Sequence, residues 1–95
     1  SLLASQPESA PLHFVLGNQY AAQGRWTEAQ EAYFRAFSSD DSHPDYAFNL
    51  AVSLDRLRQS RLALDYYRKA ISLAAKRAAI FDLAGAQARA RELER

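Results

Sequence analysis

Apolar side chains recur at helical spacing through most of this chain. The two clearest sets share the order Ala-x-x-x-Tyr-x-x-Ala and consist of Ala29, Tyr33 and Ala36, and of Ala63, Tyr67 and Ala70. A spacing of four and then three residues places all the side chains of a set on one face of a helix. Only three Gly and three Pro interrupt the helical pattern. We therefore predict an all-α chain.

Capping and helix-breaking residues divide the chain into five predicted helices. The expected ranges are residues 9–24, 27–39, 42–57, 60–75 and 78–93. The residues expected to cap or end them are Ser9 and Gly24 for the first helix, Thr27 with Gln30 for the second, Ser42 for the third and Ser60 for the fourth. Hydroxyl side chains are favoured at these places because they accept hydrogen bonds from unpaired N–H groups of the first helical turn.

The chain also matches itself at an offset of 34 residues. The identical pairs are Phe14/Phe48, Leu16/Leu50, Ala29/Ala63, Tyr33/Tyr67, Ala36/Ala70 and Ser38/Ser72. Their placement is informative, because small residues let two helices approach closely and large residues fill the space between them. We therefore predict two repeat units, each a pair of helices.

With these residues at these positions, the chain resembles the tetratricopeptide repeat family, whose unit is a helix-turn-helix of about 34 residues. The units are residues 10–43 and 44–77, followed by a capping half repeat at 78–95 and preceded by a linker or expression-derived lead at 1–9. The resemblance implies antiparallel helix-turn-helix repeats stacked as a short right-handed superhelical solenoid. The second unit departs from the family at Arg58, where Gly is usual, and at Ala75, where Pro is usual. Another antiparallel array of helical hairpins is the alternative.

Composition and charge exclude several classes of function. The 95 residues include no Cys, which removes disulfides, thiol catalysis and thiolate metal sites. Twelve basic and eleven acidic residues leave a formal charge of +1, so the overall charge favours neither nucleic acid nor an acidic membrane surface. No apolar run approaches the roughly 18–20 residues of a membrane span. We expect a soluble domain, cytoplasmic or periplasmic, that belongs to a longer chain.

Residues 38–45, with the sequence SSDDSHPD, contain the residue types of a hydrolytic triad. Neighbours on one turn do not readily adopt the geometry in which a base lies between a nucleophile and an acid, so a helix-capping turn explains them better. His13 and His43 are thirty residues apart and have no second ligand at metal-site spacing. Acidic residues interrupt the basic side chains of the fifth helix. We expect no enzyme, no cofactor, no metal and no nucleic acid.

The resemblance implies a binding groove, because in this family the first helix of each unit lines a concave surface that holds a peptide. By the family's positions, the groove residues are Phe14, Val15, Asn18 and Ala22; Phe48, Asn49, Val52, Asp55 and Arg56; and Asp82, Leu83, Ala86 and Arg89. Some family members capture a C-terminal carboxylate with cations and amides. Asn18 and Asn49 keep the amides here, but Phe14, Ala79 and Leu83 replace the cations. The resemblance therefore implies that a peptide is held by neutral hydrogen bonds and apolar packing, without charge-assisted capture of a carboxylate.

We expect a non-catalytic scaffold or adaptor that binds a peptide segment of a partner protein, without direct membrane contact. The Ala-rich, Cys-free residues 45–55 resemble bacterial repeats. Because repeat proteins of this family are common in bacterial secretion and pilus assembly machinery, the resemblance implies that setting. The alternative is a self-associating element that forms a homo-oligomer through its half repeat. Ile80, Phe81 and Ala84 are expected to pack on the fourth helix, which leaves Leu83 or Leu93 uncovered.

Overall fold

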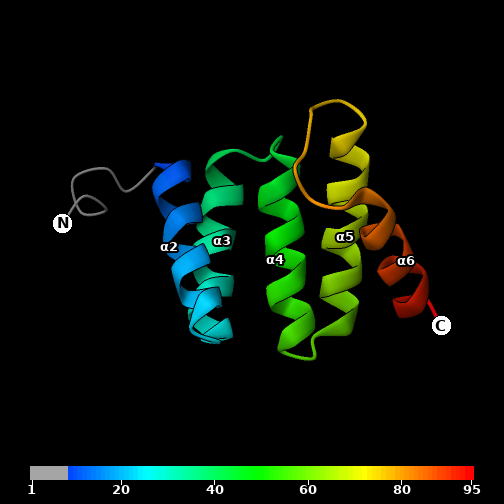
Figure 1. Cartoon of the computed structure of the whole chain (residues 1–95), viewed down its shortest axis with the longest axis horizontal. Helices are drawn as coiled ribbons and strands as arrows, with labels where there is room; N and C mark the ends of the chain where they lie inside the picture. The colour runs from blue at the N-terminus through cyan, green and yellow to red at the C-terminus, as the bar shows by residue number, and fades with distance from the viewer. Residues whose placement is uncertain (1–8) are drawn as a thin grey trace.

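A computed structural model describes residues 9–95, which form five α-helices and no strand (Figure 1). The helices are α2 (Ala10–Ala22), α3 (Trp26–Ser39), α4 (Pro44–Arg56), α5 (Ser60–Ala74) and α6 (Leu83–Leu93). The prediction of an all-α chain is confirmed. The predicted lead, residues 1–9, lies outside the described residues except for Ser9.

Each helix packs on the next one along the chain. Contacts join α2 to α3, α3 to α4, α4 to α5 and α5 to α6. Figure 1 shows α2 to α5 side by side with nearly parallel axes, joined by short turns that reverse the chain direction, and α6 inclined across α5. This arrangement of neighbouring antiparallel helices is consistent with a helical repeat.

The core consists largely of small residues and tyrosines. Ala29, Ala63 and Ala51 are fully buried, and Tyr33 and Tyr67 are nearly so. These are the faces that the helical spacing predicts. A Cβ atom added at Gly17 of α2 would lie 2.5 Å from the Tyr33 ring of α3, which shows how closely these two helices approach.

Two turns adopt the same backbone conformation 34 residues apart. Gly24 has a φ of 72° and Arg58 has a φ of 65°. The Gly24 and Arg25 N–H groups donate to the carbonyls of Ala21 and Tyr20, and the Arg58 and Gln59 N–H groups donate to those of Asp55 and Leu54. A side chain in this left-handed conformation costs about 1 kcal/mol, and glycine avoids that cost. Arg58 thus forms the turn that glycine usually forms, although at a steric cost.

Three of the predicted caps are wrong. Helix α3 begins at Trp26, so Thr27 lies inside its first turn, and α5 begins at Ser60 with Gln59 as its N-cap residue. Helix α4 is capped by His43, whose Nδ1 accepts a hydrogen bond from the Asp45 N–H. Ser42 instead donates its hydroxyl proton to Asp40 at 2.8 Å. The Ser42 hydroxyl is therefore used by Asp40 and does not cap α4.

The fifth helix begins at Leu83, five residues later than predicted from Ala78. The Asp45 carboxylate explains the delay, because it accepts hydrogen bonds from the N–H groups of Ile80 (3.1 Å) and Phe81 (3.0 Å). These bonds hold the segment before α6 against the start of α4 in a non-helical conformation.

The packing predicted for this segment is also wrong. Ile80 is 91% exposed, and Ala84 is exposed as well. Phe81 stacks on Phe48 of α4, with ring centroids 4.4 Å apart. Ala86 and Ala90 provide the buried side of α6. Ile80 and Phe81 lie before the start of α6, so they are not part of a helical face.

Candidate functional site

The predicted groove residues lie on α2, α4 and α6, and they differ in exposure. Phe14 packs against Tyr46 with ring centroids 4.8 Å apart, so it contributes to the core as much as to the surface. Val15 is 51% exposed and Leu83 is 41% exposed. In the wider predicted set, Ala86 is buried and therefore cannot line a groove.

The two asparagines make hydrogen bonds within the fold. The Asn18 Oδ1 accepts a hydrogen bond from the Tyr33 hydroxyl at 2.6 Å. The Asn49 Nδ2 donates to the Asp45 carbonyl, one turn earlier in α4, at 2.9 Å. Among the described residues, the amide N–H groups of Asn18 and the Oδ1 of Asn49 make no hydrogen bond. The two side chains therefore offer amide N–H donors at Asn18 and an oxygen acceptor at Asn49.

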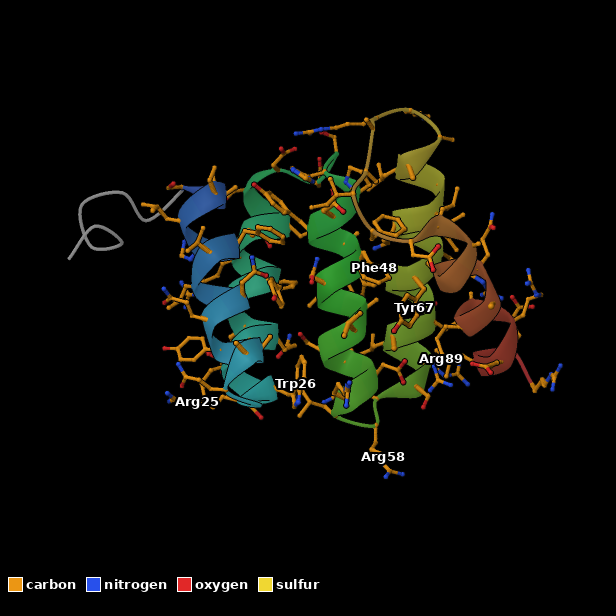
Figure 2. The ribbon with its side chains drawn as sticks, in the orientation of Figure 1. Arg25, Trp26, Phe48, Arg58, Tyr67 and Arg89 are labelled. Atoms are coloured by element: carbon orange, nitrogen blue, oxygen red, sulfur yellow. The ribbon has the colours of Figure 1, made fainter. Side chains whose placement is uncertain are left out.

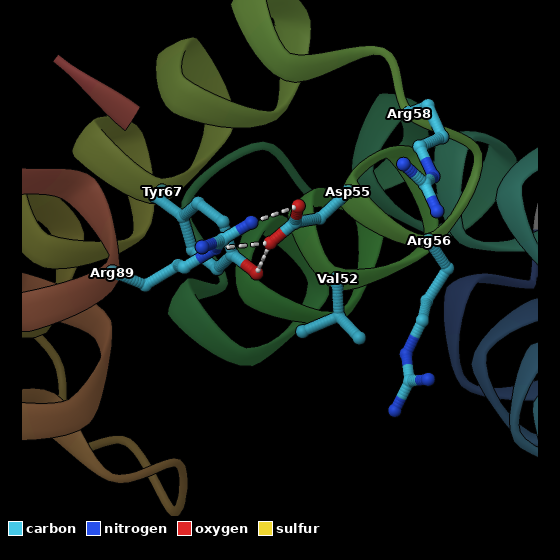
Figure 3. Close-up of a pocket in the computed structure, with 6 residues that line it drawn as sticks. All are labelled: Val52, Asp55, Arg56, Arg58, Tyr67 and Arg89. Atoms are coloured by element: carbon cyan, nitrogen blue, oxygen red, sulfur yellow. Dashed lines mark hydrogen bonds and ion pairs between the residues drawn. The ribbon is translucent and has the colours of Figure 1, made fainter. Parts of the chain in front are cut away.

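One pocket brings predicted groove residues together with others. It lies between α4, the α4–α5 turn, α5 and α6, and has a volume of about 480 Å³ (Figure 3). We call it the arginine pocket. Its lining residues are Val52, Asp55, Arg56, Arg58, Tyr67 and Arg89. The predicted residues Phe14, Val15, Asn18, Phe48, Asn49 and Leu83 lie outside it.

Asp55 is the centre of the hydrogen bonds in this pocket. Arg89 donates to it twice, from Nε to Oδ2 and from Nη2 to Oδ1, each at 2.8 Å, and Tyr67 donates its hydroxyl proton to Oδ2 at 2.9 Å. Two parallel bonds from one guanidinium are the strongest arrangement that this pair of groups can adopt. They join α6 to the end of α4.

The charges of this cluster stabilise one another. Arg89, more than Tyr67, holds the pKa of the Asp55 carboxyl below its usual value. Burial, and then the hydrogen bond to Asp55, raise the pKa of the Tyr67 hydroxyl well above its usual range. Bonds to Asp55 and Glu92 raise the pKa of Arg89. Asp55 and Arg89 therefore stay ionised and paired at neutral pH.

The other two arginines of the pocket lie across Asp55 from Arg89 and carry no dashed line in Figure 3. The guanidinium carbon of Arg56 lies 5.2 Å from the centroid of the Trp26 ring of α3, which is a cation–π distance. Arg58 is exposed at the α4–α5 turn. Figure 2 shows Trp26 and Arg58 at the end of the molecule where the α2–α3 and α4–α5 turns lie.

Four of the six residues that line the pocket belong to the set that the resemblance assigned to a groove. Val52, Asp55 and Arg56 were expected in the groove, with Arg89 in the same set. Tyr67 was expected in the core, where most of its ring lies, and its hydroxyl bond to Asp55 leaves no sequence signal. Arg58 had a signal, because it stands where the repeat usually has glycine. By itself, this departure from the family pattern does not indicate that Arg58 lines a pocket.

The Ser, His and Asp residues that suggested a hydrolytic triad lie at the turn between α3 and α4, where their contacts stabilise the turn. Asp40 accepts hydrogen bonds from Ser42 (2.8 Å) and Arg77 (3.1 Å), and the His43 ring stacks on Tyr46. Within residues 9–95, no group of three or more His, Asp or Glu residues could hold a metal ion. Over the same residues, no helix has both the length and the apolar character needed to cross a membrane.

Comparison of this sequence with protein-family models and with curated proteins returns no match. The fold and the pocket define an all-α domain of antiparallel helices with a localised cluster of arginines.

Proposed function

We propose that this chain is a non-catalytic interaction module of the tetratricopeptide repeat type, which binds a peptide segment of a partner protein along the face of α2, α4 and α6. The observation that carries the proposal is the pair of equivalent turns at Gly24 and Arg58, 34 residues apart, between helices that pack through small residues. Stacking such units produces the extended binding surfaces of repeat proteins.

The side chains on this face suit an extended peptide. Asn18 offers amide N–H donors to a peptide carbonyl, and Asn49 offers Oδ1 as an acceptor for a peptide N–H. The exposed Val15 and Leu83 and the half-buried Val52 offer apolar contacts to its side chains. A peptide backbone has one donor and one acceptor per residue, so both amides would be used.

The test uses a peptide selected from a displayed random library against the intact chain, with affinity measured by calorimetry. We expect Asn49→Ala to weaken binding by on the order of 1 kcal/mol, about fivefold. Asn18→Asp is the matching variant on α2, because it keeps the acceptor for the Tyr33 hydroxyl while it removes the donor. The control is Gln19→Ala, an exposed neighbour on the same helix.

The control should bind as the wild type does. If both asparagine variants also bind the selected peptide with wild-type affinity, the peptide does not lie along this face and the proposal is wrong. A melting temperature for each variant separates lost binding from lost folding.

The exposed Ile80 and Leu83 favour a second candidate function, self-association through the segment around the start of α6. Two apolar side chains so close in sequence form a small patch that another copy of the chain would cover. Sedimentation, described below at the scale of the whole molecule, separates this candidate from the first.

A further inference from the structure

We propose that the arginine pocket is a subsite for an acidic side chain of the bound peptide, with Arg56 and Arg58 as the groups that bind its carboxylate. This inference rests on the proposed function and adds the charge of the ligand to it. The three arginines of the pocket lie outside the positions at which the resemblance expects cations, which Phe14, Ala79 and Leu83 occupy.

The charge of the pocket is unbalanced. Its lining holds three arginines and one aspartate, which gives +3 − 1 = +2, whereas the whole chain has a formal charge of +1. Arg89 and Tyr67 already occupy both oxygens of Asp55. Within residues 9–95, the side chains of Arg56 and Arg58 form neither a hydrogen bond nor an ion pair. The pocket therefore holds two positive charges that an incoming carboxylate can neutralise.

The backbone of Arg58 supports a role for its side chain. Gly24 forms the equivalent turn without strain, whereas Arg58 adopts the same left-handed conformation with a side chain attached. Strained residues of this kind gather at binding sites, where the side chain is needed in spite of the strain. Arg58 is exposed and makes no polar contact with the rest of the described fold, so the fold does not account for an arginine at this position.

The Arg56 side chain packs on Trp26. Its guanidinium carbon lies 5.2 Å from the centroid of the Trp26 ring, and its N–H groups make no hydrogen bond among the described residues, so they can make the planar, two-bond contact that a carboxylate accepts. Val52 and the Tyr67 ring provide an apolar wall that suits the methylene groups of a Glu side chain. Val52 also lies on the α4 face of the proposed groove, so a peptide in that groove reaches the pocket.

A peptide carboxylate fits this site better than nucleic acid does. The positive charge is confined to one pocket of about 480 Å³, enough for one or two side chains and too local to follow a phosphate backbone.

The test uses Trp26, the only tryptophan of the chain, as a reporter of events at Arg56. Acetylated and amidated hexaglutamate is titrated against the intact chain, with hexaglutamine as the neutral probe. We expect hexaglutamate to change the Trp26 emission and to bind about tenfold more tightly than hexaglutamine, because charge-assisted hydrogen bonds are the stronger ones. We expect its affinity to fall as NaCl is raised.

Two variants and a control test the residues. Arg58→Gly should weaken hexaglutamate binding by about tenfold while it raises the urea midpoint of unfolding, since it relieves the strained backbone. Arg56→Gln should weaken binding to a similar extent. Arg35→Gln, which removes the same charge from an exposed site on α3, should leave the affinity within about twofold of wild type.

Several results would overturn the inference. They are no change in Trp26 emission at millimolar hexaglutamate, equal affinity for hexaglutamine, wild-type affinity of Arg58→Gly, or tighter binding of inorganic phosphate or of a single-stranded oligonucleotide. If the library-selected peptide still depends on Asn18 and Asn49 in that case, the proposed function stands without the acidic subsite. Conversely, if hexaglutamate binding depends on Arg58 but the selected peptide binds the asparagine variants as it binds wild type, the acidic subsite stands and the proposed groove is wrong.

Discussion

His43 links the turn before α4 to the helix itself. Its Nδ1 accepts a hydrogen bond from the Asp45 N–H, and its ring stacks on Tyr46 with centroids 3.8 Å apart. Burial, and then the charge of Arg77, lower the pKa of His43 below its usual value of 6.5. Because Nδ1 can accept a hydrogen bond only while it is unprotonated, this cap of α4 depends on the neutral imidazole.

We therefore predict that stability falls as the pH is lowered through about 6.5. The unfolded chain, with the higher pKa, binds the proton first, so the loss begins near that pH and continues down to the lower pKa of folded His43. His43→Asn keeps a capping side chain that does not titrate, and should flatten the decline. Urea midpoints at pH 7.5, 6.5 and 5.5 measure this, with wild type as the reference. A variant that declines as steeply as wild type would show that the cap is not the cause.

At the scale of elements, both ends of helix α4 bind the last part of the chain. The buried Asp45 carboxylate near its start binds the N–H groups of Ile80 and Phe81, and Asp55 near its end binds Arg89 of α6. Between them, Phe48 stacks on Phe81. Helix α6 is therefore positioned by α4 as well as by its packing on α5.

We predict that Asp45→Ala lowers the free energy of unfolding by on the order of 2 kcal/mol, since it leaves two backbone N–H groups without their charged acceptor. The loss should be concentrated in the last helix. Amide hydrogen exchange should quicken across residues 80–93 more than across α3. Asp65→Ala, which changes an exposed carboxylate on α5, is the control and should alter neither measurement. Uniform faster exchange in all helices would instead mean that Asp45 supports the whole core.

At the scale of the whole molecule, the large exposed apolar side chains among residues 9–95 are Val15, Phe34, Leu62, Ile80 and Leu83. They lie on different elements apart from the neighbours Ile80 and Leu83, and single exposed apolar residues are normal on a protein surface. Among the described residues, Ile80 and Leu83 are therefore the large exposed apolar side chains that lie closest together in the sequence.

We accordingly predict that the chain sediments with the mass of a single molecule over a range of concentrations. The patch at Ile80 and Leu83 is small compared with the buried surface that stable dimers need. Sedimentation velocity at low, middle and high micromolar concentration measures this. A mass that rises with concentration in wild type, and that Leu83→Asp returns to that of one chain, would favour self-association over peptide binding.

The sequence alone determined those features that depend on neighbours within one turn or on a fixed period. The spacing of Ala29, Tyr33 and Ala36 identified a buried helical face, because side chains three and four residues apart share a side of any helix. Gly24 marked a chain reversal for an equally local reason. The resemblance placed Val52, Asp55 and Arg56 on one surface, where the pocket brings them together.

The tertiary structure decided whatever depends on which groups meet across space. Asp45 lies 35 residues before Ile80, and Asp55 lies 34 residues before Arg89. No local sequence pattern predicts either pair. The first pair delays the start of α6, because a buried carboxylate is a stronger acceptor for those N–H groups than another helical turn would be. The second, with the strained turn at Arg58, assembles the arginine pocket. A hydrogen bond depends on the distance and angle between two atoms, and only the packing of the helices sets these for residues so far apart in the sequence.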